Sequence, residues 1–337
     1  MVSIRGPTAL NCSTRRRRRS WSGRRVGPAP SGHRPGRRDR SSPSCSPAAD
    51  EPSVSSPSSP DLLEWGRPRL RDLPWRQTRD PWPVLVAEVM LQQTRVDRVV
   101  PRWGRFLDRF PDPAACAEAP VGDVLREWSG LGYNRRAVNL HRCATQVVAM
   151  HGGDLPADLD ALLALPGIGS YTARAVLAFA FEEDVAVVDT NVARVLARRA
   201  GRRLTMGGAQ ALADASVPDE EGWAWNQVML DLGALVCRAR RPRCGECPVS
   251  GGCAWQGSGP DPATGSAGVS GTQSRFEGSD RQGRGRLVAA LGRGPVAARH
   301  LAPVMGWPDD PGRSEQVAAG VVADGLAIRS GSTYRLP

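Results

Sequence analysis

Four cysteines lie close together near residue 245 and restrict what this chain can fold around. They follow the spacing C-x6-C-x2-C-x5-C within a window of 17 residues, and they are Cys237, Cys244, Cys247 and Cys253. Four thiolates this close can bind one metal centre, whereas disulfides at such short spacings would strain one another. Only the middle two form the short pair that structural zinc sites repeat, so the spacing favours a [4Fe–4S] cluster over a zinc ion or free thiols.

The other cysteines, Cys12, Cys45, Cys116 and Cys143, are scattered along the chain. Cys143 falls in an apolar helical pattern, which is typical of a buried free thiol. Thiolate ligation and the lack of a secretory signal together predict a location in the reducing cytoplasm. The sequence has no window of 18 apolar residues, so we expect no membrane-spanning segment.

Residues 1–60 differ in composition from the rest of the chain. They are mostly Arg, Ser, Pro and Gly with almost no apolar periodicity, which predicts a disordered tail. Twelve Arg against three acidic residues give this tail +9 of the total charge of +11, so about +2 remains for residues 61–337. The tail either contacts DNA phosphates without sequence preference or reflects a misassigned start codon.

The chain contains no lysine, so all 45 of its Lys and Arg residues are Arg. The guanidinium group of Arg stays protonated and cannot act as a neutral amine nucleophile. Reaction through a Schiff base on a side chain is therefore excluded.

Hydrophobic periodicity predicts one helix after another from Asp61 to about Trp255, with short turns at Pro and Gly and no convincing alternating strand. The predicted helices are 83–94, 97–109, 121–129, 134–151, 158–164, 170–181, 189–200, 207–216 and 222–235. We therefore expect an all-α core.

The remainder of the chain predicts a linker and a second small domain. Residues 256–281 are assigned to the linker because they begin with a stretch of Gly, Ser, Pro, Ala and Thr. Residues 282–337 predict three short helices, at 284–292, 298–305 and 314–325, followed by a hairpin around Ser330–Ser332. This order resembles a winged helix, and a helical appendage without a role in DNA binding is the alternative.

A Gly-x-Gly turn joins two predicted helices in the segment Leu165–Tyr171, which reads LPGIGSY. Glycine allows a tight turn at Gly167 and Gly169, and the second helix opens at Ser170. Unpaired N–H groups at a helix start can bind a DNA phosphate without any side-chain charge. The turn alone is weak evidence for phosphate binding, and the iron–sulfur pattern downstream strengthens it.

Two carboxylic acids occur in patterns that suit catalysis. Glu88 lies in the run Trp82–Leu91, which is apolar on nearly every helical face, so burial should raise its pKa and let it act as a general acid. Asp189 follows the apolar run 185–188 and begins a helix, where the helix dipole favours its ionised form. An anion suits an oxocarbenium-like sugar, although an ordinary N-cap is the plain alternative for Asp189.

Several motifs follow one another in the order of a known superfamily. They are Leu73-Pro74-Trp75-Arg76, Glu88 to Thr94 (EVMLQQT), Gly130-Leu131-Gly132-Tyr133, the Gly-x-Gly turn, Val188-Asp189-Thr190-Asn191-Val192 and the four cysteines. From about Leu63 to Trp255 the chain resembles the helix–hairpin–helix superfamily of base-excision DNA glycosylases, in the cluster-bearing branch that includes endonuclease III and the MutY adenine glycosylases. The resemblance implies a two-lobed all-α domain at 61–255, with a six-helix lobe at about 83–185 and a cluster lobe formed by 61–82 and 186–255.

The resemblance also implies an activity. It predicts a monofunctional DNA glycosylase of base excision repair that flips out and hydrolyses adenine opposite 8-oxoguanine or guanine, acting on double-stranded DNA in the nucleoid as a monomer. Glu88 would protonate the departing adenine at N7, and Asp189, oriented by Asn191, would stabilise the sugar cation. Tyr171 occupies the position of the lysine with which the endonuclease III branch attacks C1′, so we expect no β-lyase activity.

Gln93 and Tyr133 match positions of the resembled family whose side chains wedge into the base stack beside the opposing base. Beyond the shared domain the resemblance is incomplete, because MutY proteins commonly carry a C-terminal β-rich domain, similar to nudix hydrolases, that reads 8-oxoguanine.

Two other functions remain open at this point. A thymine or uracil mismatch glycosylase can also have tyrosine in place of the lysine, although the Met90–Thr94 stretch favours adenine. The second is a cluster-bearing DNA-binding or redox-sensing protein without catalysis.

Overall fold

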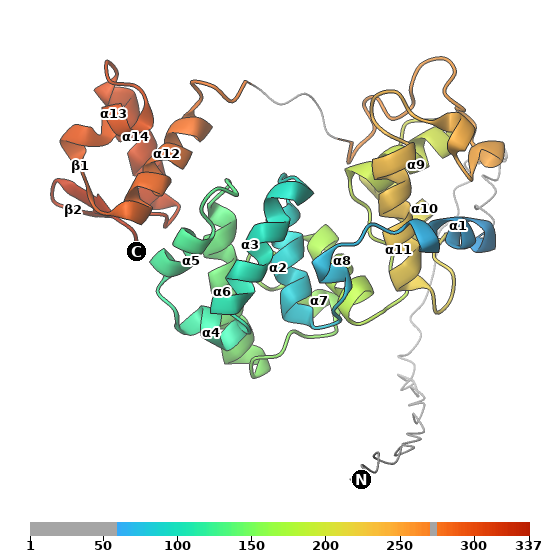
Figure 1. The fold of residues 1–337 in the computed structure, drawn as a ribbon, viewed down its shortest axis with the longest axis horizontal. Coiled ribbons are helices and arrows are strands. Elements are labelled where there is room, and N and C mark those ends of the chain that lie inside the picture. Colours follow the sequence, from blue (N-terminus) through green and yellow to red (C-terminus); the bar gives the residue numbers. More distant parts are fainter. Residues whose placement is uncertain (1–58, 270–274) are drawn as a thin grey trace, which may run out of the picture. The chain divides into compact units, whose positions relative to one another are not determined.

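The structure of the chain is a computed structural model that describes residues 59–269 and 275–337 (Figure 1). The predicted tail, apart from its last two residues, lies outside this part. The helices before the linker are α1 (Ser59–Gly66), α2 (Pro81–Leu91), α3 (Val96–Arg109), α4 (Pro113–Glu118), α5 (Val121–Glu127), α6 (Arg135–His151), α7 (Leu159–Leu163), α8 (Ser170–Ala180), α9 (Thr190–Ala200), α10 (Met206–Asp214) and α11 (Gly222–Asp231). Short 3-10 helices occupy Arg67–Arg69, Pro74–Arg76, Cys244–Glu246 and Ser250–Gly252, and a π-helix occupies Leu232–Val236. Every regular element described before residue 280 is helical, which confirms the all-α core.

Two helices, α1 and α4, form where hydrophobic periodicity predicted none. Helix α4 has only six residues, too few for a periodic pattern to stand out. Its start carries two local signals, because the Asp112 side chain accepts a hydrogen bond of 2.8 Å from the Ala115 amide and Pro113 is the first helical residue. Capping residues therefore mark this helix better than its apolar pattern does.

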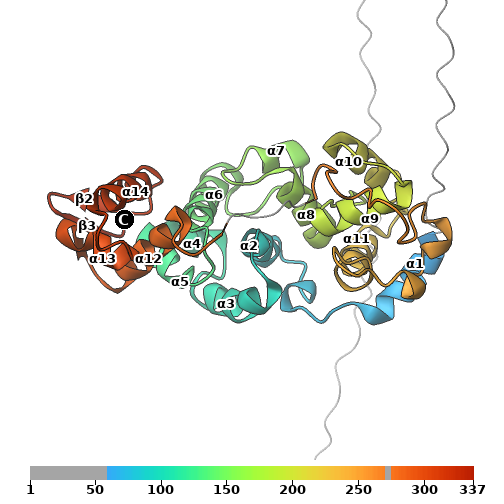
Figure 2. The ribbon, with the colours of Figure 1, turned by 90° about the horizontal axis from the view of Figure 1, so that it is seen from above.

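Helix α2 forms the centre of the first hydrophobic core. It is apolar on nearly every face, and such a helix is stable only when it is buried on all sides. It packs against α3, α6 and α8, which lie around it in Figure 2. Leu85, Met90, Phe106, Trp128 and Leu140 are among the fully buried side chains of this core.

The second core contains residues from two separate stretches of the chain. Leu62 of α1 lies in one hydrophobic cluster with Val192 of α9 and with Trp225 and Val228 of α11. The segment before α2 thus packs with the segment after α8, while the lobe boundaries at 61–82 and 186–255 stay a prediction.

The predicted linker at 256–281 begins later than the sequence suggested. Backbone hydrogen bonds join Ala254 to Arg199 and Ala267 to Leu204, and the side chain of Asp261 forms an ion pair of 2.6 Å with Arg198. Ser266 is buried at 5% exposure, so residues 256–269 pack on the cluster lobe. Composition alone predicted a linker here, but Gly, Ser and Pro also form ordered turns when side chains elsewhere in the fold hold them. Residues 270–274 of that prediction lie outside the described residues.

The C-terminal residues form α12 (Asp280–Arg293), α13 (Leu301–Met305), α14 (Pro311–Ala323) and strands β1 (Val296–Ala297), β2 (Ile328–Ser330) and β3 (Thr333–Arg335). A 3-10 turn, Ala298–His300, precedes α13. The strands form an antiparallel sheet in the order β1-β3-β2, in which Tyr334 of β3 pairs with Val296 and with Arg329. The three helices and the hairpin occur where they were predicted, whereas β1 was not predicted; the winged-helix assignment stays a prediction. Among the described helices, none combines the length and the apolar character that a membrane span requires.

Candidate active site

Glu88 and Tyr171 lie together in the core of the six-helix lobe. Glu88 is on α2 and is 4% exposed, and the Tyr171 hydroxyl on α8 donates a hydrogen bond of 2.9 Å to its Oε2 atom. Burial raises the pKa of Glu88 to about 7, although the hydrogen bond from Tyr171 works in the opposite direction. A carboxyl group with this pKa can hold a proton near neutral pH and release it to a base, as a general acid must.

Asp189 is the N-cap of α9 and collects three hydrogen bonds. Its Oδ1 atom accepts from the backbone amides of Asn191 at 2.8 Å and Val192 at 2.7 Å, and its Oδ2 atom accepts from the Asn191 side chain at 2.7 Å. The sequence predicted that the helix start would favour the ionised form. Burial has the larger effect and raises the pKa of Asp189 above its ordinary value, while the hydrogen bonds lower it. The N-cap and the predicted catalytic position therefore coincide.

Sequence patterns predict no role for Arg194, which lies one helical turn after Asn191. Its guanidinium donates to Oδ1 of Asn191 at 2.9 Å, to the carbonyl of Gly233 at 2.7 Å and to the carbonyl of Cys237 at 2.8 Å. Asn191 is thus held between Asp189 and Arg194. Spacing of three residues on one helix was the only sequence signal for this contact.

Arg76, from the Leu-Pro-Trp-Arg motif, also had no predicted role. It is buried at 7% exposure and forms two hydrogen bonds of 2.9 Å with the carboxylate of Asp231, at the end of α11. Its positive charge also lowers the pKa of Glu88. This ion pair joins the segment before α2 to the helix that leads to the cysteines.

The Gly-x-Gly turn has the geometry expected at a phosphate site. Gly167 has a φ of +79°, and a Cβ atom there would lie 2.7 Å from the Cβ of Asn139, so this position requires glycine. Gly169 is the N-cap of α8 in an extended conformation, and no side chain caps the helix there. The N–H groups at the start of α8, next to exposed Ser170, are therefore available to an anion. Only the first of the two glycines needs its conformational freedom.

Gln93 and Tyr133 both adopt the left-handed backbone region, with φ values of 55° and 47°. Residues other than glycine are uncommon there, so neighbouring contacts must hold each of them in place. The Tyr133 side chain is 42% exposed. These two predicted DNA contacts therefore occur in tight turns, at residues 92–94 and 130–133.

The four cysteines line one pocket, together with Arg198, Trp255 and residues of the intervening loops. The described residues contain no group of three or more His, Cys, Asp or Glu side chains arranged to hold a metal ion. Thiols that surround a pocket fit a multi-atom cluster better than a single zinc ion. Arg198 contacts the Sγ atom of Cys237 at 3.4 Å, and such a donor suits a thiolate.

Comparison with known proteins supports the two halves of this site separately. Residues 86–204 match the family described as HhH-GPD superfamily base excision DNA repair protein. Residues 237–253, which begin and end at the first and last of the four cysteines, match the iron–sulfur binding domain of endonuclease III. The chain is also 41% identical over 290 residues to the adenine DNA glycosylase of Mycobacterium tuberculosis, which covers 83% of this chain and 94% of that protein. The chain belongs to the adenine DNA glycosylase family.

Solved structures agree with membership of the adenine DNA glycosylase family at the level of fold. A thermostable thymine-DNA glycosylase aligns with a TM-score of 0.54 and 30% identity, over 59% of this chain and 94% of that one. A non-covalent endonuclease III–DNA complex aligns with a TM-score of 0.53 and 24% identity, over 59% of this chain and 92% of that one. The enzyme is therefore a DNA-binding glycosylase of base excision repair with an iron–sulfur cluster, as the motifs predicted.

Within this adenine DNA glycosylase, one hydrogen bond joins Tyr171 to Glu88 and another joins Asn191 to Asp189. The charge of Asp189 also contributes to the raised pKa of Glu88. The [4Fe–4S] cluster would be held by the four cysteines, and Arg194 links Asn191 to the backbone carbonyl of the first of them, Cys237.

Proposed function

We propose that this adenine DNA glycosylase hydrolyses adenine mispaired with 8-oxoguanine, or with guanine, in double-stranded DNA, and that it acts as a monomer on nucleoid DNA. The observation that carries the proposal is the hydrogen bond of 2.9 Å between Tyr171 and Glu88, in a site where the pKa of Glu88 is about 7. A buried acid of this strength can protonate a leaving base, and the tyrosine holds it in one orientation.

The proposed reaction assigns one step to each side chain. After the adenosine is flipped out of the duplex, Glu88 donates its proton to N7 of adenine, which makes the base a better leaving group. As the C1′–N9 bond breaks, Asp189 stabilises the positive charge that develops on the sugar. Asn191 fixes the orientation of Asp189 through its hydrogen bond of 2.7 Å. Water then adds to C1′ and gives up a proton to a carboxylate, which leaves an abasic site.

The same residues support a monofunctional enzyme. An associated β-lyase needs an amine that attacks C1′, and the chain has tyrosine at position 171 and no lysine at any position. Strand cleavage should therefore require added alkali.

The cluster has a structural role in this proposal. The [4Fe–4S] group, when bound to the four cysteines, supplies a rigid crosslink for the loop Arg238–Arg243, which carries four Arg and can contact DNA phosphates. Gly167, Gly169 and Ser170 contribute backbone N–H groups to the same backbone recognition.

One assay tests the substrate. A duplex with a single A:8-oxoguanine pair is incubated with the protein and then treated with alkali, in parallel with A:G, T:G and U:G duplexes. We expect alkali-dependent cleavage at the adenine of the first two. Cleavage of the T:G or U:G duplex would favour the thymine or uracil alternative, and cleavage without alkali would contradict the monofunctional assignment. Glu88→Gln should retain binding to the A:8-oxoguanine duplex and lose excision by a factor of about 100 to 10,000.

A further inference from the structure

Arg136, on α6, connects the two turns that carry Gln93 and Tyr133. These two wedge turns comprise residues 92–94 and 130–133. The guanidinium is buried, at 9% exposure for the residue, and makes six hydrogen bonds, all to uncharged oxygen atoms. Among the described residues, no carboxylate forms an ion pair with it within 4.0 Å, so only uncharged groups stabilise its charge.

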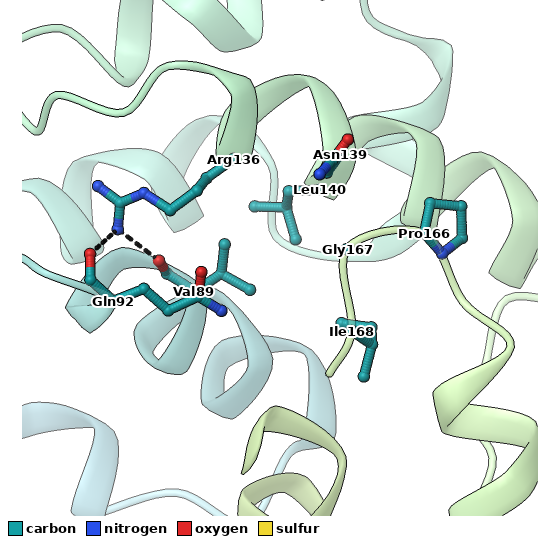
Figure 3. Close-up of a pocket in the computed structure, with 8 residues that line it drawn as sticks. All are labelled: Val89, Gln92, Arg136, Asn139, Leu140, Pro166, Gly167 and Ile168. Atoms are coloured by element: carbon teal, nitrogen blue, oxygen red, sulfur yellow. Dashed lines mark hydrogen bonds between the residues drawn. The ribbon is translucent and has the colours of Figure 1, made fainter. Parts of the chain in front are cut away.

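The two terminal nitrogens of Arg136 have different partners. Nη1 donates to the carbonyls of Val89 at 2.7 Å, Met90 at 2.9 Å and Gln92 at 2.7 Å, and Figure 3 shows the bonds to Val89 and Gln92. These groups lie at the C-terminal end of α2, where carbonyls lack partners within the helix and the helix dipole favours a cation. Arg136 therefore fixes the first wedge turn to the end of the helix that carries Glu88.

Nη2 donates to the second wedge turn and also returns to the first. It donates to the carbonyls of Gly132 at 3.0 Å and Leu131 at 3.5 Å, and to the Thr94 hydroxyl at 3.0 Å. The Thr94 hydroxyl also contacts the carbonyl of Leu131 at 3.3 Å. The planar guanidinium thus bridges both turns in one rigid group, which a single ammonium group could not do.

Both turns need such support. Gln93 and Tyr133 adopt left-handed backbone conformations that cost free energy unless neighbours hold them. The guanidinium also lies 5.6 Å from the centre of the Tyr133 ring and 5.3 Å from that of the Trp128 ring, within the range of cation–π attraction. One buried side chain therefore contacts the backbone of both turns and also the ring of Tyr133.

We propose that Arg136 is a positioning residue for base extrusion, which holds the wedge turns at a fixed separation so that Gln93 and Tyr133 enter the base stack together. The inference rests on the proposed function, in which these two residues contact DNA. Arg136 itself does not reach the DNA or the adenine. Its loss should therefore reduce extrusion more than it reduces binding of the duplex.

The test measures extrusion directly, with 2-aminopurine in place of the target adenine, opposite 8-oxoguanine. The proteins carry Glu88→Gln so that no excision occurs, and fluorescence at saturating protein reports the extruded base. Arg136→Lys keeps the charge at the end of α2 and loses the bridge, so we expect the extruded fraction to fall about tenfold. Duplex affinity, measured by anisotropy, should change by less than about threefold, because the phosphate contacts are retained.

Controls separate this role from a general loss of structure. Arg105→Lys changes an exposed Arg on α3 that pairs with Glu127, and it should leave extrusion unchanged. When Tyr133→Ala is already present, Arg136→Lys should have little further effect on extrusion, because Arg136 is proposed to act by positioning Tyr133. If Arg136→Lys does not fold, Thr94→Val removes one bridging hydroxyl with little change in shape and should give a smaller loss of the same kind.

The outcomes distinguish the proposed role of Arg136 from the proposed function on which it rests. Normal extrusion with Arg136→Lys or Thr94→Val would overturn the proposed role of Arg136 alone. An equal loss from Arg136→Lys in the presence and absence of Tyr133 would do the same. Normal extrusion with Tyr133→Ala would overturn the assignment of Tyr133 as a wedge residue, and with it the proposed role of Arg136. If the unmodified enzyme fails to excise adenine in the alkali assay, the proposed function itself is wrong.

Discussion

The Tyr171 hydroxyl donates a hydrogen bond of 2.9 Å to Oε2 of Glu88, although the two residues are 83 positions apart. The contact exists because α2 and α8 pack against each other in the first core. Tyr171 is the second residue of α8, directly after the Gly-x-Gly turn, so the proposed general acid and the proposed phosphate site share one helix end. We therefore propose that chemistry and DNA binding are coupled at this position.

The pH dependence of excision should report the ionisation of Glu88. Burial raises the pKa of Glu88 to about 7, and the general acid must be protonated, so the rate should decline as the pH rises through that value. The pKa of Asp189 is also raised above its ordinary value, so its protonation should lower the rate on the acid side. Single-turnover rates across pH measure both limbs. A rate that is flat or rising above pH of about 7 would contradict the assignment of Glu88 as the acid.

Tyr171→Phe should shift the basic limb of this profile upward. The hydrogen bond from Tyr171 stabilises the carboxylate and lowers the pKa of Glu88, so its removal should raise that pKa further. The measurement is the single-turnover pH profile of the variant. Tyr334→Phe is the matched control, because Tyr334 lies on strand β3 of the C-terminal sheet and has no role in the proposed reaction; it should leave the profile in place.

Gly167→Ala should destabilise the turn, by about 1 to 3 kcal/mol, and weaken DNA binding. The new Cβ would lie 2.7 Å from Asn139 Cβ, and φ at this position is +79°. Gly169→Ala provides the control, since a Cβ there meets no atom within 4 Å and φ is −97°. Thermal unfolding compares the two proteins. Equal stability would show that the turn tolerates a side chain at Gly167.

Asp261→Ala should destabilise the cluster lobe by about 2 kcal/mol, a value reduced from that of a fully buried pair because Asp261 is partly exposed. The Arg198 side chain is 2% exposed and the Asp261 side chain 25% exposed, and their contact of 2.6 Å secures residues 256–269. Glu246→Ala breaks an exposed pair with Arg243 in the same lobe and should cost less than about 0.5 kcal/mol. Chemical denaturation with the cluster bound measures both, and similar losses would argue against a structural role for Asp261.

Cys247→Ser should abolish the visible absorbance of the cluster and lower both stability and DNA affinity before it changes the chemistry at adenine. Glu88, Tyr171 and Asp189 contribute no ligand to the cluster, so residual excision at saturating protein should persist. Cys143→Ala removes a thiol buried in the first core and should leave the absorbance intact. If Cys247→Ser retained the full cluster absorbance, the ligand set would be wrong.

Local sequence signals predicted most of the helices because each depends on residues within a few turns. Helix α8 was predicted at 170–181 and is found at Ser170–Ala180, since the glycine before it and the apolar spacing within it suffice. Helix α4 and strand β1 were missed because they are too short for periodicity. The stretch 256–269 was misassigned because its order comes from Arg198 and other residues of α9, which composition does not reveal.

The sequence by itself determined the family and predicted the cluster ligands and the acid, because each is carried by residue types at short, characteristic spacings. The tertiary structure decided what those residues do to one another. Arg136, Arg194 and Arg76 had no predicted role, yet each bonds groups that lie more than 35 residues away along the chain. Such contacts depend on how helices pack, and packing is set by the shape of the whole core rather than by any local pattern.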